Sequence, residues 1–122
     1  MFRITRSFEI SCGHHLPLHK GKCRNPHGHN YQIEVTLWAD ELQREGPSTG
    51  MVSDFAELDR HVDAILKDLD HHDLNLVLAE AYQPPTAENL AKYLYDASQF
   101  IFMNVWSVKV WETRDSFVEV SR

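Results

Sequence analysis

The sequence predicts an α+β domain in which two helices cover one face of a four-stranded antiparallel sheet. Four segments alternate apolar and polar residues, as half-buried strands do, and two segments repeat apolar residues at helical spacing. They follow the order strand, strand, helix, helix, strand, strand. A helix with one apolar stripe must bury it, so both helices are expected against the same sheet face. With 122 residues, the chain fits one domain spanning 1–122.

The first two strands are expected at residues 2–12 and 30–39. In the second, four apolar residues occupy alternate positions, and polar residues or Trp38 occupy the others: Tyr31, Ile33, Val35 and Leu37. Residues 13–29 contain three glycines and two prolines, which favour a loop. A long structured loop inside a compact domain is usually functional.

The two helices are expected after Asp54 and after Thr86. Asp54 is a plausible N-cap, and apolar residues follow it at helical spacing up to Leu69. The second helix begins after Pro84-Pro85, with Thr86 as its cap and Glu88 in its first turn, where an acid favours the helix dipole.

Residues 105–112 and 116–121 are expected to form the last two strands, joined by a turn at Arg114-Asp115. A single sheet of four strands has two open edges and one face that its helices leave uncovered. We therefore expect oligomerisation that continues the sheet.

Composition argues against several classes of protein. The net charge of −6 disfavours general nucleic-acid binding, and the apolar runs fall short of the roughly 20 residues of a membrane span. The first residues lack the apolar run of a signal peptide. Two cysteines, Cys12 and Cys23, are too few for a secreted disulfide scaffold, so a cytoplasmic protein with reduced thiols is expected. A disulfide between them is the alternative.

The segment from Cys23 to Tyr31 carries the strongest chemical signal. In a strand, His27 and His29 would point to the same side, and a third histidine lies close by at His14 or His15. Three protein ligands with one open position are usual for catalytic zinc. Chance clustering of the eight histidines is the alternative. Cys23 could serve as a base or nucleophile, or as the fourth ligand of a closed structural zinc site.

Three further groups are candidates for the same chemistry. Asp70 beside His71 could polarise an imidazole, although a charged helix end is the commoner explanation. Glu112 shares a strand face with Val108 and Val110 and could bind an amidine-like ring edge, or simply be solvated. A basic cluster in this acidic chain could bind a phosphorylated substrate or be a solvated loop: Lys20, Lys22 and Arg24.

Six segments together resemble the 6-pyruvoyl-tetrahydropterin synthase superfamily, in the family's order and over most of the chain. They begin with Gly13-His14-His15-Leu16-Pro17, Gly21-Lys22-Cys23 with His27-Gly28-His29-Asn30-Tyr31, and Gly50-Met51-Val52-Ser53-Asp54-Phe55. They end with Leu69-Asp70-His71-His72-Asp73-Leu74-Asn75, Pro85-Thr86-Ala87-Glu88-Asn89-Leu90 and Val110-Trp111-Glu112-Thr113.

The resemblance implies the tunnelling fold, in which trimers close a barrel and two trimers stack into a homohexamer with active sites between subunits. It implies a Zn2+ site, a catalytic group and a pterin-binding group. The implied zinc ligands are His14, His27 and His29. The implied catalytic residues are Cys23, Asp70 and His71. The implied pterin-binding residues are Glu112, with Thr113 and Thr86 as helpers.

The interval between Cys23 and His27 is short, which is typical of the bacterial 6-carboxy-5,6,7,8-tetrahydropterin synthase branch of the queuosine pathway. That branch implies a lyase acting on 7,8-dihydroneopterin triphosphate. The pyruvoyl-forming branch is the alternative, because Asn25-Pro26 is similar to its loop and residues 10–13 depart from the usual pattern. A zinc-containing pterin- or purine-binding module without turnover is a second alternative.

Overall fold

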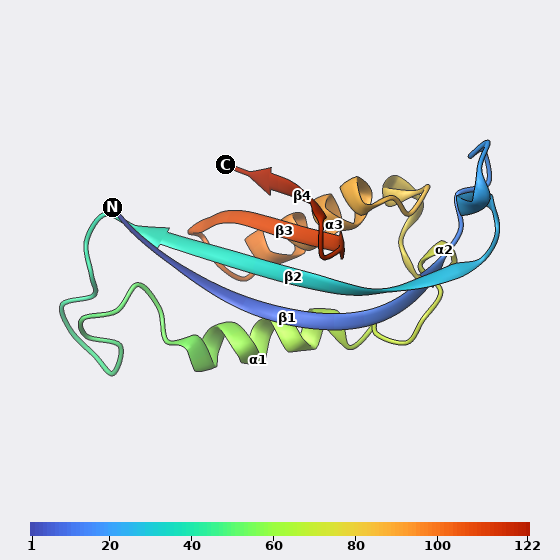
Figure 1. Ribbon diagram of the computed structural model, residues 1–122. Helices are drawn as coiled ribbons and strands as arrows, with labels where there is room; N and C mark the ends of the chain where they lie inside the picture. The colour runs from blue at the N-terminus through green and yellow to red at the C-terminus, as the bar shows by residue number, and fades with distance from the viewer.

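The computed structural model covers residues 1–122 and confirms the four-stranded antiparallel sheet. Its strands lie side by side in chain order, β1-β2-β3-β4 (Figure 1). They are β1 (Phe2–His14), β2 (His27–Ala39), β3 (Val105–Thr113) and β4 (Ser116–Ser121). β1 and β2 are the longest strands, and both reach one end of the molecule, where the histidines lie.

Two helices, α1 (Phe55–Leu66) and α3 (Ala87–Gln99), lie on one face of the sheet, as the sequence predicts (Figure 1). Asp54 caps α1 by accepting a hydrogen bond from the Ala56 N–H, and Thr86 caps α3 by accepting one from the Asn89 N–H. The chain also forms a short helix, α2 (Leu74–Val77), and two 3-10 turns, η1 (Lys22–Arg24) and η2 (Glu80–Tyr82). A helix of one turn is too short to show in hydrophobic spacing.

The hydrophobic core lies between this sheet face and the helices. Alternate residues of β2 are almost completely buried, which confirms the face predicted for that strand. The helices contribute their apolar stripes to the same cluster: Leu58, Val62 and Leu66 from α1, and Leu90, Ala91 and Leu94 from α3. No helix of the chain has the length and apolar character needed to cross a membrane.

The first two strands are longer than the sequence predicts, and the loop between them is shorter. β1 and β2 stay paired as far as Gly13 opposite Gly28 and His14 opposite His27. The glycines were expected in a loop, but here they permit close approach, since a Cβ on Gly28 would lie 3.3 Å from the Cys12 carbonyl oxygen. The pairing therefore carries two histidines to facing positions.

The opposite face of the sheet is not covered by a helix (Figure 1). It carries polar and aromatic side chains, with the Thr5 and Thr36 hydroxyls 2.7 Å apart and the Arg3 guanidinium 3.8 Å from the Trp106 ring centre. β4 pairs only with β3, and β1 pairs only with β2. Apart from the Ser11–Gly13 end of β1, which residues 70–73 contact, both outer strands therefore leave backbone groups free along their outer edges.

Candidate metal centre and active site

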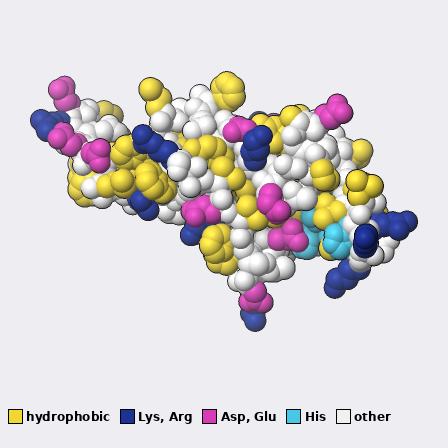
Figure 2. All heavy atoms as spheres, turned by 90° about the horizontal axis from the view of Figure 1, so that it is seen from above, with side chains coloured by type: hydrophobic (Ala, Val, Ile, Leu, Met, Phe, Trp, Pro, Cys, Tyr) yellow, Lys and Arg dark blue, Asp and Glu magenta, His cyan; other side chains and the backbone are white.

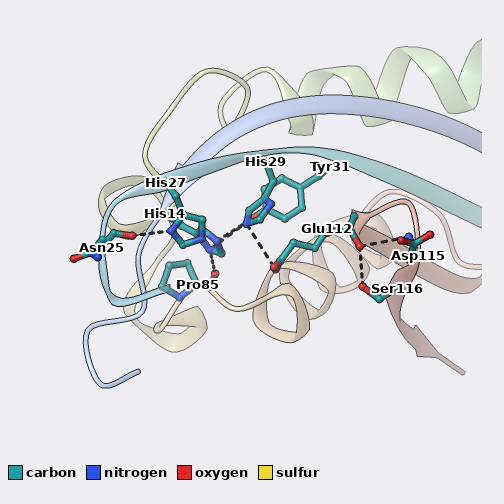
Figure 3. Close-up of polar contacts among 10 residues, drawn as sticks. His14, Asn25, His27, His29, Tyr31, Pro85, Glu112, Asp115 and Ser116 are labelled. Carbon is teal, nitrogen blue, oxygen red and sulfur yellow. Dashed lines mark hydrogen bonds and ion pairs between the residues drawn. The ribbon is translucent and has the colours of Figure 1, made fainter. Parts of the chain in front are cut away.

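Three histidines meet at the end of the β1–β2 pair (Figure 3). His14 comes from β1 and is only 3% exposed, while His27 and His29 come from β2. One ring nitrogen of each lies within 4.8 Å of the others. The pairing of His14 with His27 and the two-residue period of the strand place all three rings on one side of the sheet.

Backbone carbonyl groups fix the orientation of two of these rings. His14 Nδ1 lies 2.7 Å from the Pro85 carbonyl oxygen, and His27 Nδ1 lies 2.7 Å from that of Asn25. A carbonyl oxygen only accepts, so Nδ1 carries the hydrogen in both rings and Nε2 keeps its lone pair. Such second contacts usually set the tautomer and direction of metal-ligating histidines.

Two of the nitrogens that face the centre of the cluster have no hydrogen-bond partner within the protein. The Nε2 atoms of His27 and His29 are both buried without a hydrogen bond, which is costly in a folded protein. Burial is the main cause that lowers the pKa of His29, against the opposing effect of Glu112, and a lowered pKa favours the neutral ring that a metal ligand requires. These residues therefore fit a divalent metal ion.

Cys23 is not part of this cluster of potential ligands, which consists of the three histidines alone. The thiol belongs to η1 in the loop between β1 and β2 and is partly exposed. The geometry does not support the closed four-ligand zinc site, so the cluster keeps an open side. A cleft of about 490 Å³ lies at the same end of the β1–β2 pair, and it is lined by residues from both faces of the sheet.

Glu112 lies beside His29, on the side away from His14 and His27 (Figure 3). Its Oε1 is 3.5 Å from His29 Nε2, and its side chain is 31% exposed. The carboxylate extends from the face of β3 that also carries the buried Val108 and Val110. It is therefore directed toward the histidine cluster rather than only into solvent.

Asp70 and His71 form a close pair on the outer edge of β1. His71 Nδ1 lies 3.0 Å from Asp70 Oδ1, which also accepts a hydrogen bond from the Ser11 N–H. That backbone hydrogen bond is the main reason that the pKa of Asp70 is lowered, and His71 adds to it. His71 has a φ of 62°, an unusual backbone conformation for a residue other than glycine, and donates its N–H to the Ser11 carbonyl.

The residues that line this cleft include His71 and the three clustered histidines, so the Asp70-His71 segment and the histidine cluster adjoin the same end of the sheet. Cys23 does not line it. The other cysteine, Cys12, is buried beneath the cleft and donates from Sγ to the Leu69 carbonyl at 3.1 Å. Burial raises the pKa of the Cys12 thiol to about 12, which keeps it neutral.

The two threonines lie apart from Glu112. Thr113 follows it on the strand, so its side chain faces the opposite side of the sheet, where its hydroxyl lies 3.0 Å from that of Ser116. Thr86 serves as the α3 cap and also lines a groove beside residues 16–19. Neither side chain touches the histidine cluster within this chain.

The basic residues Lys20, Lys22 and Arg24 are exposed on the loop beside the cluster. Figure 2 shows Lys and Arg side chains gathered at this end of the molecule, next to the histidines. A positively charged surface in a chain of net charge −6 is suited to an anionic ligand.

Sequence reasoning missed two residues that support the site. Asn75 fastens the loop after His14 by accepting from the His15 N–H and donating to the His15 carbonyl. Tyr31 lies completely buried against the rings of His14 and His29. The alternation of His27, His29 and Tyr31 along β2 indicated that Tyr31 shares a strand face with the two histidines. Nothing in the sequence indicated that Asn75 bonds to the backbone of His15.

The sheet, its helices and the histidine cluster define the molecule as a tunnelling-fold protein. The family model for 6-pyruvoyl tetrahydropterin synthase matches residues 3–122, and the chain belongs to this family. The chain is 40% identical over 96 residues to 6-carboxy-5,6,7,8-tetrahydropterin synthase of Synechocystis sp., a match covering 78% of this chain and 73% of that protein.

Two further comparisons connect the chain with the pyruvoyl-forming proteins. It is 38% identical over 104 residues to human 6-pyruvoyl tetrahydrobiopterin synthase, covering 80% of this chain and 69% of the human protein. The structure of Caenorhabditis elegans 6-pyruvoyl tetrahydropterin synthase superimposes with a TM-score of 0.84 at 28% identity, over 99% of this chain and 95% of that one. The family is thus shown, and both branches are among the relatives.

Proposed function

We propose that this chain is a zinc-dependent 6-carboxy-5,6,7,8-tetrahydropterin synthase of queuosine biosynthesis, a cytoplasmic lyase. With one molecule of water, it converts 7,8-dihydroneopterin triphosphate into 6-carboxytetrahydropterin, acetaldehyde and triphosphate. The observation that carries the proposal is the cluster of three histidines, in which two inward Nε2 atoms have no hydrogen bond and the Glu112 carboxylate lies beside His29. The short interval between Cys23 and His27 and the Synechocystis relative favour the carboxy product.

Each residue has a proposed role in this reaction. His14, His27 and His29 would hold the zinc ion, which would supply a Lewis acid for the hydroxylated side chain of the substrate. Glu112 accepts hydrogen bonds from the pterin ring edge. Cys23 removes a proton from the side chain as a thiolate, and His71, oriented by Asp70, exchanges protons as a general acid or base. Thr113 and Thr86 assist ring binding.

The phosphate end of the substrate requires positive charge. Lys20, Lys22 and Arg24 lie exposed beside the cluster, and we assign them to the triphosphate. Lysine binds phosphate as a point charge, whereas arginine can form paired hydrogen bonds with it. An acidic protein gains most from such a local cluster, because its overall field repels the substrate.

The distribution of residues within one chain supports an assembled enzyme. Cys23, Thr113 and Thr86 do not reach the cleft that His71 shares with the histidine cluster. The free edges of β1 and β4 offer backbone groups for pairing between subunits. We infer a homohexamer, a dimer of trimers, in which subunits complete one another's sites.

A second candidate is a 6-pyruvoyl-tetrahydropterin synthase, in which triphosphate is eliminated and the carbon side chain is retained. The matching family model and the human relative favour it. The metal, the thiol and Glu112 would keep their roles in that enzyme.

The deciding experiment is incubation of the zinc-loaded protein with 7,8-dihydroneopterin triphosphate, with products identified by mass spectrometry. Carboxytetrahydropterin together with acetaldehyde is the expected result. A pyruvoyl product would assign the chain to the second candidate. Binding of the pterin without turnover by the assembled, zinc-loaded protein would instead indicate a zinc-containing binding module and contradict both enzymes.

A further inference from the structure

Tyr31 is a buried polar group at the metal centre for which the proposed mechanism has no role. Its side chain is 0% exposed, although it ends in a hydroxyl group. Its ring meets that of His29 at 5.5 Å between centres and that of His14 at 6.1 Å. Figure 3 shows the ring beside His29, with the hydroxyl contact to His14 dashed. The hydroxyl therefore ends among the metal-ligating imidazoles.

The hydroxyl has only long contacts there. Its oxygen is 3.4 Å from His14 Nδ1 and 3.5 Å from His14 Nε2, well beyond the length of about 2.8 Å usual for a hydroxyl hydrogen bond. The Nδ1 hydrogen already points to the Pro85 carbonyl at 2.7 Å. Once a metal ion occupies Nε2, neither nitrogen can accept the tyrosine hydrogen.

A buried hydroxyl without an acceptor is unfavourable, so a partner is expected when the site is in use. Glu112 also lies beside His29, but its Oε1 contacts His29 Nε2 at 3.5 Å, and no hydrogen bond joins Glu112 to Tyr31. A ligand entering the open side of the cluster is the remaining acceptor.

We propose that Tyr31 donates a hydrogen bond to an oxyanion ligand bound at the open side of the histidine cluster, and so acts as a substrate-contacting residue. The ligand class is an oxygen anion, such as a carboxylate or the deprotonated hydroxyl of a pterin side chain. This inference rests on the metal site of the proposed function. It adds a neutral, buried donor that stabilises negative charge on oxygen.

The test replaces zinc by cobalt(II) and titrates the protein with acetate, following the visible cobalt absorption without any pterin. Tyr31→Phe removes the oxygen and keeps the ring contacts. We expect cobalt stoichiometry to be unchanged and acetate affinity to fall about 10-fold, the effect of losing one hydrogen bond to a charged group. Tyr95→Phe is the matched control, since the buried Tyr95 hydroxyl bonds with Gln99 in α3, away from the site.

Four results would overturn the proposal, and the last of them would overturn the proposed function too. Equal acetate affinity in wild type and Tyr31→Phe would show that the hydroxyl does not meet the ligand. Loss of cobalt in Tyr31→Phe would make the residue structural. An acetate effect that disappears in the Glu112→Ala background would assign the hydroxyl to Glu112 instead. If wild-type protein takes up no cobalt, the metal centre and the proposed function fail as well.

Discussion

At the scale of single residues, the histidine cluster shows why tautomers matter as much as positions. The carbonyl groups of Pro85 and Asn25 accept hydrogen bonds from Nδ1 of His14 and of His27, respectively. The Nε2 atoms of both rings are thereby left facing the centre of the cluster. The spacing of His27 and His29 was visible in the sequence, but the choice between His14 and His15 required the family resemblance. The structure places His14 in the cluster.

The first prediction concerns the metal. His27→Ala should abolish stoichiometric zinc, because the two remaining imidazoles would bind the ion far more weakly than three imidazoles do. Metal content after dialysis, measured by atomic emission, checks this. His61→Ala is the control, since His61 packs against Phe102 elsewhere on the molecule. Full zinc in the His27 variant would refute the ligand assignment.

The second prediction concerns the thiol. Cys23→Ala should retain zinc and the fold but lose turnover by about 100-fold or more, the usual contribution of a positioned proton-transfer group. Cys12→Ala should keep much more activity, because that thiol is buried, neutral and bonded to the Leu69 carbonyl. Near-normal turnover without Cys23 would exclude a catalytic thiol.

The third prediction separates ring binding from metal binding. Glu112→Ala should weaken pterin binding about 10-fold or more, because charge-assisted hydrogen bonds to the ring are lost. Zinc content should change little, since the three histidines are intact. Calorimetric titration with a non-reactive pterin provides the measurement. Unchanged pterin affinity would contradict the assigned role.

At the scale of elements, local signals predicted the helices well and the strand ends poorly. Asp54 and Thr86 cap the helices as expected, because a cap depends on neighbouring residues in the chain. The strand ends depend on residues that meet from distant positions, so Gly13 and Gly28 suggested a loop when read singly. Glu112 and Thr113 likewise belong to opposite faces, which the alternation of the strand could have shown.

The fourth prediction tests a helix cap. Asp54→Ala should destabilise the protein by about 1 kcal/mol, because the Ala56 N–H loses its acceptor at the start of α1. Asp54→Asn should restore most of the loss, since an asparagine oxygen can accept the same hydrogen bond. Urea unfolding followed by circular dichroism measures both. Equal midpoints for alanine and wild type would show that the cap contributes nothing.

At the scale of the whole molecule, the sheet has one covered face, one uncovered face and two free edges. The sequence predicted this condition, because four strands and two one-sided helices cannot cover every surface. It could not predict that Cys23 would lie outside the cleft that contains His71, because this depends on the path of the loop. The separation is the structural reason to expect sites shared between subunits.

The fifth prediction tests pairing between subunits. Along β1, the N–H groups of Ser11 and Gly13 point outward, so alternation places that of Ser7 outward as well. Ser7→Pro should block the edge and yield monomers of 14.2 kDa, while proline at an edge leaves the β1–β2 pairing intact. Light scattering after gel filtration checks this, with Ser7→Ala as control. Persistence of a large assembly would exclude this edge as the contact.

The segment that carries Asp70 and His71 also limits how another chain can dock. It covers the outer edge of β1 at its histidine end through Ser11 and through the bridge between Gly13 and Asp73. An added strand can therefore pair only along residues 3–9 and cannot slide toward the cleft. In the proposed oligomer, this segment would therefore limit the register in which a neighbouring chain can pair and would oppose open-ended, fibril-like growth of the sheet.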